Sequence, residues 1–514
     1  MSSNSIPLLT AHLFISKDST LDGLKEMLIR FEESNIITKL YEESDKITDT
    51  NHKAPRVYVS IGERSEDFAE LYKLPYHERK RWLHFKSPAE VQPGYLFYCW
   101  LKATDPLPEN KTIPNSKFSS NTPLVSVFTA AYKSGEKIQR PYQSLLKQTY
   151  TNWEWVIIDD SGDEDFTYKK DLLPLTDGRI RRYRQDSSNG YIGSTKRYAA
   201  GLCTGEILIE LDHDDELTSD CLQKIVDAFL KHPECGFVYG DCTEVYAGSN
   251  LAHWYGWDCG FGYAVYYRVW VHEMNRWQNV LRNTVINATT INHLVGLPNH
   301  PRAWTRDCYH ILGGHREELL VADDYDMLVR TFLCTKYAAV PDLLYIQYRN
   351  ENGDNSTFTR NHQIQVLVKE LNNYYKERIH TRLKELELPE NLAYSRVWQR
   401  AADDSALKGA NIIDEASSKV SIIFPIPYSC ASNNREKLLD TLKKGMESDF
   451  RDMEIVIAGY IPSEVEAYAS KAPMGAILWW PMEEKDSLED IIQYAKLCSS
   501  CKEKIVIMPE DISK

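Results

Sequence analysis

The chain has 514 residues, 43% of them hydrophobic, and a formal net charge of −14 at pH 7. This length is too great for one compact core and suggests about three domains. The acidic balance argues against a nucleic-acid partner held by bulk electrostatics, so an anionic substrate would need a local site. Without a signal-peptide pattern or a long apolar window, and with 11 mostly scattered cysteines, we expect an intracellular protein.

Residues 1–103 are predicted to form a small α/β domain. Apolar runs at 13–15 and 57–61 predict strands, and the amphipathic pattern at 21–31 predicts a helix. No catalytic cluster stands out, so we expect a structural or docking role. Residues 104–122, rich in Pro, Asn and Ser, predict a linker.

A second domain is predicted from residue 123. A strand at 124–129, a helix at 141–148 and a strand at 154–158 indicate a parallel sheet. The third element ends in Asp159-Asp160, and a later strand at 207–211 also ends in acids. Ligands of open α/β sheets lie beyond the carboxyl ends of the strands. We therefore expect both acidic groups at one edge of the sheet.

The stretch that follows the strand at 207–211 crowds four carboxylates together: Asp212, Asp214, Asp215 and Glu216. Their mutual repulsion costs free energy unless a cation or hydrogen-bond donors offset it. Mg²⁺ and Mn²⁺ take carboxylate oxygens and commonly share their other positions with substrate phosphates. The same residues also suit a solvated turn that caps the next helix, and both interpretations can hold at once.

Two further segments are candidates for binding or catalysis. The Gly-rich loop 189–193 leads into a helix, where backbone N–H groups attract anions, and Lys196 could reach a phosphate or simply be solvated. Asp323, Asp324 and Asp326 begin an amphipathic helix, where carboxylates are also ordinary partners of the helix dipole. Between these segments, residues 253–304 are dense in aromatic side chains, which suit either sugar binding or a core.

These motifs occur in the order and approximate spacing of family 2 glycosyltransferases. The matching segments are 124–129, 148–150, 153–162, 189–196, 204–206 and 211–215. The resemblance covers about 125–350 and implies a central GT-A domain, a Rossmann-like mixed sheet with helices on both faces, flanked by smaller α/β domains.

The resemblance also implies a nucleotide-sugar donor and a divalent metal. The D-x-D pair Asp212 and Asp214 would hold Mn²⁺ or Mg²⁺ on the diphosphate, and Asp324 would be the catalytic base, with Asp323 as its nearest competitor. The sequence departs from the family at Arg197, where Asn is more common, and at Asn350, which stands where a histidine often follows Tyr-Arg. The residues implied to contact the donor are Thr129, Tyr132, Asp159, Asp160, Asn189, Gly190, Lys196, Asp212 and His213. Candidates for a third metal ligand are His300, His315 and His362.

The C-terminal third is predicted to contain a helical spacer at 361–414 and a degenerate repeat at 415–514. The segment 419–425 parallels 124–129, 453–459 parallels 153–160, and 504–511 parallels 206–212. The acids of the central domain are replaced by Ala458-Gly459 and Pro509-Glu510-Asp511. We expect a truncated GT-A-like half without a site that packs, dimerises or holds an acceptor, unless the similarity arose by chance.

The sequence thus predicts a metal-dependent inverting glycosyltransferase that moves a sugar, with a UDP-sugar favoured, to a glycan or glycoconjugate hydroxyl in polysaccharide biosynthesis. We expect it in the cytoplasm, at most peripheral to a membrane that carries the acceptor. The alternatives are a non-catalytic carbohydrate-binding scaffold and a sugar nucleotidyltransferase. Pocket shape decides the sugar and the acceptor, so the sequence names neither.

Overall fold

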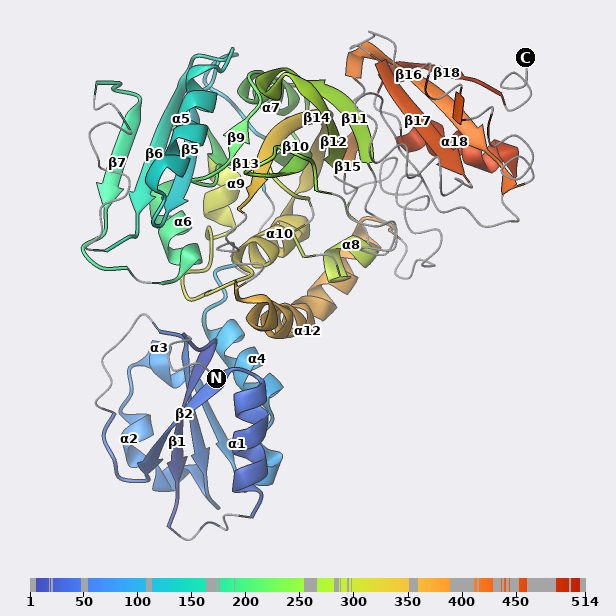
Figure 1. The fold of residues 1–514 in the computed structure, drawn as a ribbon. Helices are drawn as coiled ribbons and strands as arrows, with labels where there is room; N and C mark the ends of the chain where they lie inside the picture. Colours follow the sequence, from blue (N-terminus) through green and yellow to red (C-terminus); the bar gives the residue numbers. More distant parts are fainter. Residues whose placement is uncertain are drawn as a thin grey trace.

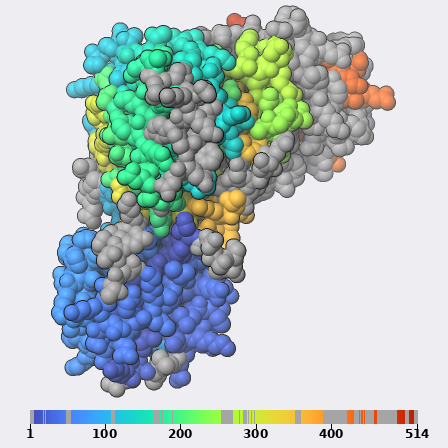
Figure 2. Space-filling view, turned by 60° about the vertical axis from the view of Figure 1, so that its left-hand side comes forward, coloured from blue at the N-terminus to red at the C-terminus, as the bar shows by residue number. Residues whose placement is uncertain are grey.

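The chain folds into three parts, shown in the computed structural model of Figure 1. An N-terminal lobe lies below a large central sheet, and a small C-terminal sheet lies beside β11 and β12. Figure 2 shows the N-terminal lobe set off from the rest of the molecule. The structure describes residues 6–388 apart from short gaps, chiefly 48–53, 108–112, 163–172, 254–265 and 351–358, and parts of 411–508.

The N-terminal lobe is a parallel four-stranded sheet with the strand order β2-β1-β3-β4. The apolar runs of β1 and β3 are fully buried, and side chains of both faces pack against helices. The lobe thus has the α/β fold that the sequence predicts, and its bounds as a separate domain, 1–103, stay a prediction. Its elements are β1 (Leu9–Ile15), α1 (Leu24–Glu33), β2 (Ile36–Glu42), β3 (Arg56–Ile61), α2 (Ala69–Tyr72), α3 (Tyr76–Arg79), β4 (Trp82–Phe85) and α4 (Pro93–Ala103).

The central sheet is mixed and has the strand path β11-β12-β10-β13-β8-β5-β6-β7, with β14 paired to β10, β9 and β15. β6, β5 and β8 are parallel, so their carboxyl ends meet at one edge, whereas β13 runs antiparallel between β8 and β10. The strands are β5 (Val125–Ala131), β6 (Trp153–Asp159), β7 (Ile180–Arg184), β8 (Ile207–Glu210), β9 (Glu216–Leu217), β10 (Cys235–Tyr246), β11 (Tyr266–Val271), β12 (Arg276–Leu281), β13 (Arg302–Thr305), β14 (Lys336–Arg349) and β15 (Asn411–Ile413).

Helices cover both faces of this sheet, so the predicted mixed α/β fold is confirmed. One buried cluster packs α5 and α7 on one face, and α7 carries the apolar stripe Leu222, Ile225, Val226 and Phe229 into it. The other face packs against α6, α9 and α10. The helices are α5 (Gln139–Leu146), α6 (Ile192–Gly201), α7 (Cys221–Lys231), α8 (Ala288–His293), α9 (Arg306–Ile311), α10 (Asp323–Cys334) and α12 (Asn361–Glu385).

The second of these cores continues from the central sheet into the N-terminal lobe. Trp100 of α4 is completely buried in it, and α12 buries Leu367, Leu371 and Tyr375 in the same cluster. The helix α12 contacts α4, α8 and α10. Its interpretation as a spacer is therefore wrong for residues 361–385, because a spacer would not bury an apolar stripe in a shared core.

The described part of the C-terminal region is a parallel sheet with the order β17-β16-β18 and one helix, α18 (Leu488–Cys498). The strands are β16 (Ala416–Ile426), β17 (Met453–Gly459) and β18 (Cys501–Val506). Their order matches that of β6, β5 and β8, as the predicted repeat requires; whether it is a repeat stays a prediction. Among the described residues, no helix is both long and apolar enough to cross a membrane.

Candidate active site

The carboxyl ends of β5, β6 and β8 bring together the acids that the sequence singles out. Asp159 ends β6 and accepts hydrogen bonds from the backbone N–H and the hydroxyl of Ser161. Asp160 accepts a bond from the Ser188 hydroxyl at 3.2 Å. Both carboxylates are buried and held in fixed orientations at this edge. Tyr132 lies just beyond the end of β5, and its ring is exposed.

The three aspartates after β8 differ in their surroundings. The side chain of Asp212 is 34% exposed, and Asp214 accepts a bond from the Asn350 amide at 2.7 Å. Asp215 is buried and accepts bonds from the Tyr345 hydroxyl and the Tyr348 backbone N–H. Burial, together with the neighbouring acids, raises the pKa of Asp215 well above its ordinary value. Asp215 therefore connects the segment after β8 to β14, while the Asp212 side chain stays partly exposed.

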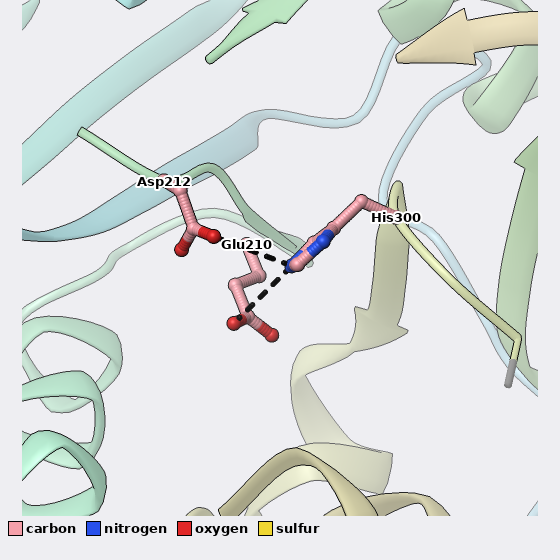
Figure 3. Close-up of side chains that lie close together, drawn as sticks. All are labelled: Glu210, Asp212 and His300. Atoms are coloured by element: carbon pink, nitrogen blue, oxygen red, sulfur yellow. Dashed lines mark ion pairs between the residues drawn. The ribbon is translucent and has the colours of Figure 1, made fainter. Parts of the chain in front are cut away.

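Asp212 lies beside two residues that come from other positions in the sheet, Glu210 and His300. Within the described part of the chain, these three offer ligand atoms that all lie within 4.8 Å of one another. Figure 3 shows the His300 ring pointing between the two carboxylates. His300 Nε2 lies 3.5 Å from Glu210 Oε1 and 4.0 Å from Asp212 Oδ2, and the ring stacks on Tyr345. Imidazole and carboxylate together form a donor set that suits a divalent transition metal.

Lys196 is buried next to this group. The sequence had suggested that it contacts the donor. Its ammonium lies 2.6 Å from Glu210 Oε1 and 3.0 Å from Asp323 Oδ2. Burial alone would lower the pKa of Lys196, but the two carboxylates outweigh it and raise that pKa well above its ordinary value. In turn, Lys196 holds the pKa of Glu210 well below its usual range despite burial. Lys196 is thus a buried counterion of Glu210 and Asp323, and its contact with the donor stays a prediction.

His315 lies behind the same carboxylates and is completely buried. Its Nδ1 is 2.7 Å from the Tyr309 hydroxyl, and its Nε2 lies 3.8 Å from Glu210 Oε2 and 3.9 Å from Asp323 Oδ2. Burial lowers the pKa of His315 to about 3. The ring is therefore neutral at physiological pH and adds no positive charge to the group.

The two candidate bases differ in accessibility. The side chain of Asp323 is 7% exposed and bonded to Lys196, and burial raises its pKa to about 6. The side chain of Asp324 is 27% exposed, and its Oδ2 lies 3.2 Å from a guanidinium nitrogen of Arg302. Burial would raise the pKa of Asp324, but the Arg302 charge outweighs it and lowers that pKa. Asp324 is thus the ionised and reachable carboxylate of the pair.

The remaining predicted residues lie in different surroundings. Thr129 is completely buried; its hydroxyl donates to the Leu211 carbonyl and accepts from the Trp155 indole, so this side chain is committed to the sheet. Gly190 lies in the loop before α6 with a φ of 73°, and His213 is half-buried beside Asp212. Asn189 lies outside the described residues. His362 is exposed on the first turn of α12 and lies outside the metal-binding group.

A divalent cation fits the charge of this site. Four carboxylates, those of Glu210, Asp212, Asp323 and Asp324, face two cations, Lys196 and Arg302, which leaves two negative charges over. Both Nδ1 and Nε2 of His300 are buried without a hydrogen-bond partner among the described residues. Buried polar atoms normally have partners, so the orphaned imidazole indicates a ligand.

Glu210 and Arg302 are the residues that the sequence analysis missed. Glu210 is a single carboxylate inside the apolar run 207–211, and Arg302 pairs with it in register on the neighbouring strand β13. A buried charge in a strand must be paired, since its desolvation is otherwise too costly. That rule could have identified both residues as members of a buried ionic group.

The segment that contains these strand ends resembles a known protein family. Residues 126–288 match the family model for glycosyl transferase family 2. The chain carries a family 2 glycosyltransferase domain. The match contains β5, β6 and β8 with the acids at their ends, whereas His300, β13, α10 and β14 come after it in the chain.

Relatives of this chain include enzymes of polysaccharide synthesis. The hyaluronan synthase of Pasteurella multocida is 25% identical over 319 residues, which cover 60% of this chain and 29% of that protein. UDP-Glc:alpha-D-GlcNAc-diphosphoundecaprenol beta-1,3-glucosyltransferase WfgD of Escherichia coli is 30% identical over 118 residues, 23% of this chain and 45% of that protein. The chain thus spans less than half the length of either relative.

Among solved structures, TarS of S. aureus in complex with UDP matches 52% of this chain and 67% of its own, with 14% identity and a TM-score of 0.34. A similarity this weak carries no weight for substrate or mechanism.

Proposed function

We propose that the chain is a metal-dependent, inverting glycosyltransferase that moves a sugar from a nucleotide-diphosphate donor to a hydroxyl of a glycan or glycoconjugate. The observation that carries the proposal is the convergence of three acidic groups at one edge of a family 2 domain. Asp159 and Asp160 lie at the end of β6, Asp212 after β8, and Asp324 at the start of α10.

The donor nucleotide would lie over the ends of β5 and β6. There the buried carboxylates of Asp159 and Asp160 are suited to accept bonds from base or ribose, and the exposed Tyr132 ring offers a stacking surface. We favour a UDP-sugar, since the name of the WfgD relative specifies a UDP-linked donor.

A divalent cation, Mn²⁺ or Mg²⁺, would be held by Asp212 and His300, with Glu210 as a third ligand. Asp214, the second acid of the D-x-D pair, lies outside this group and is held by Asn350, so its role in metal binding stays a prediction. When bound, such a cation offsets negative charge on the leaving diphosphate.

Asp324 would accept the proton of the acceptor hydroxyl. A general base must first be able to reach its substrate, and its pKa matters second. Asp324 meets the first condition because its carboxylate is partly exposed, whereas Asp323 is buried against Lys196. The Arg302 guanidinium fixes Asp324 from the side, which leaves the carboxylate ionised and oriented. With a carboxylate acting as base on the acceptor, one displacement at the anomeric carbon inverts its configuration.

The proposal is tested with a panel of nucleotide sugars and Mn²⁺, scored for release of the nucleoside diphosphate. We expect release from one of them, loss of that release in Asp212→Asn and Asp214→Asn, and no change in Asp227→Asn. Asp227 is a matched control because its carboxylate is exposed on α7.

Two other outcomes would replace the proposal. Pyrophosphate release from a nucleoside triphosphate would indicate a nucleotidyltransferase. A chain that binds glycans but turns over none of the donors would be a carbohydrate-binding scaffold.

A further inference from the structure

The loop of residues 313–322 connects two parts of the active site. It begins next to His315, whose Nε2 lies 3.8 Å from Glu210, and it ends at Asp323 and Asp324, the first residues of α10. The position of this loop therefore sets where His315 and both candidate bases lie relative to the metal-binding group.

The middle of the loop is held by the N-terminal lobe. Glu318 receives two hydrogen bonds from the Arg81 guanidinium, at 2.6 and 3.0 Å, and a third from the Trp100 indole at 2.7 Å. The side chains of Arg81 and Glu318 are 10% and 16% exposed, and Trp100 is fully buried. Charge-assisted, two-pronged pairs of this kind fix geometry as well as adding stability. We call this three-residue contact the Glu318 clasp.

Arg316 provides a second connection between the lobe and α10. One guanidinium nitrogen donates to the Leu101 carbonyl and the Thr104 hydroxyl of the α4 end, at 2.8 and 2.9 Å. The other side of the guanidinium bonds to Asp326 of α10 at 3.1 and 3.2 Å. Both Arg316 and Asp326 are buried. A single side chain thus joins the last turn of α4 to the first turn of the helix that carries Asp324.

The loop has little freedom to move within these contacts. A Cβ added to Gly193 of α6 would lie 2.2 Å from the Arg316 carbonyl oxygen, so the two backbones are in close contact. At its other end Ala322 has a φ of 56°, the left-handed region that is unfavourable for alanine. Such strain persists only where the surrounding structure enforces it. The clasp and Arg316 are the contacts that can enforce it.

We propose that the N-terminal lobe is a working part of the active site, because through the Glu318 clasp it positions the loop that carries His315 and leads into Asp324 of α10. Glu318, Arg81 and Trp100 are positioning residues, and this role goes beyond the structural or docking role that the sequence predicts for residues 1–103. The inference rests on the proposed function for the role of Asp324, and it adds a role for a lobe that lies outside the family 2 match.

Full-length variants test this proposal. Glu318→Gln and Arg81→Glu remove the charge pair, and Arg81→Glu combined with Glu318→Arg reverses it. We expect each single variant to lower kcat roughly 10- to 100-fold, since a displacement of about 1 Å has effects of that size. The KM for the donor should change less than about twofold, and the double variant should recover part of kcat. Arg64→Glu is the matched control, because it breaks the exposed Arg64–Asp67 pair of the same lobe.

A second measurement does not depend on activity. Amide hydrogen exchange over residues 313–326 should be faster in Glu318→Gln than in the wild type, and unchanged in Arg64→Glu. If the wild type transfers no sugar, the proposed function fails while the exchange data still test the clasp. If the wild type is active and Glu318→Gln changes neither kcat nor exchange, the clasp proposal is overturned. A lower thermal transition with unchanged kcat would likewise reduce the clasp to a stabilising contact.

Discussion

The N-terminal lobe and the central domain each contain a buried ionic cluster, and the two clusters differ in how many of their polar atoms have hydrogen-bond partners. In the lobe, Arg56 donates two bonds to the Glu78 carboxylate, at 2.5 and 3.0 Å, and the Tyr58 hydroxyl donates a third at 2.9 Å. In the central domain, the Lys196–Glu210 pair is equally close, yet both Glu210 oxygens and both His300 nitrogens lack hydrogen-bond geometry to any described residue. The first cluster is complete in itself, whereas the second has donor atoms left over, as a site for a ligand requires.

The three sheets also differ in the residues that lie at the carboxyl ends of their strands. At the end of the C-terminal sheet, a Cβ on Gly459 would lie 2.2 Å from the Ile426 carbonyl oxygen, so the two strand ends are packed together. In the lobe, Ser16 and Gly62 donate their backbone N–H groups to the carbonyls of Ile61 and Phe85. Carboxylates also follow β2 of the lobe, at Glu42, Glu43 and Asp45, but none of these is buried, whereas Asp159, Asp160 and Asp215 of the central sheet are. A parallel sheet therefore provides an edge, but its side chains decide whether that edge is a site.

The largest effect is expected for the base in the central domain. Asp324→Asn should lower kcat by roughly 10²–10⁴-fold, because general-base catalysis contributes about that much. Donor binding should hardly change, since the proposed partner of this carboxylate is the acceptor hydroxyl. Steady-state kinetics of the full chain measure both quantities. Asp323→Asn is the informative partner: if it removes kcat and Asp324→Asn does not, the base has been assigned to the wrong aspartate.

A substitution in the ionic cluster of the lobe should lower the free energy of unfolding and leave activity unchanged. Glu78→Gln leaves the Arg56 guanidinium buried without its counterion, which costs about 3 kcal/mol of unfolding free energy. Chemical denaturation followed through the lobe's tryptophans would report this loss. The same substitution should leave nucleoside diphosphate affinity within about twofold. A large fall in that affinity would show that the two clusters are not independent.

Acid should weaken the lobe cluster in a predictable pH window. Burial raises the pKa of Glu78, but the hydrogen bonds and charge of Arg56 outweigh it and hold that pKa below the ordinary value of 4.5. The carboxylate thus contributes stability that is present above pH 4.5 and is lost as the pH falls through the lowered pKa. The stability difference between wild type and Glu78→Gln should shrink below pH 4.5. A constant difference down to pH 3 would contradict this.

The smallest effect is expected at Ala322, the strained residue just before α10. Ala322→Gly should raise the unfolding free energy by at most about 1 kcal/mol, because glycine adopts a positive φ without strain. A thermal melt gives the sign, and a clear destabilisation would mean that the alanine conformation is not a strained one.

Much of the fold was predictable because its signals are local. The buried strands at 125–131, 153–159 and 207–210 are short apolar runs bounded by polar residues, and the grouping of Asp159, Asp160 and Asp212 at one edge follows from parallel pairing. The stripe of α7 was visible in its period. These features need no knowledge of distant residues.

The rest of the site depends on contacts between distant segments. Lys196 reads as a surface residue in its helix, and only the fold places it between Glu210 and Asp323. His300 was one of three histidine candidates, since a metal site is defined by distances that spacing does not give. The role of residues 361–385 was misjudged for the same reason: an apolar stripe shows that a helix is buried, but not against what.

The account depends most directly on the cation. Calorimetric titration of Mn²⁺, in the presence of UDP, into wild type, Asp212→Asn and the exposed control Asp227→Asn tests it. We predict one equivalent of Mn²⁺ bound by the wild type and the control, and binding at least about tenfold weaker in Asp212→Asn. Equal Mn²⁺ affinity in all three proteins would contradict the assignment of Glu210, Asp212 and His300 as a metal centre.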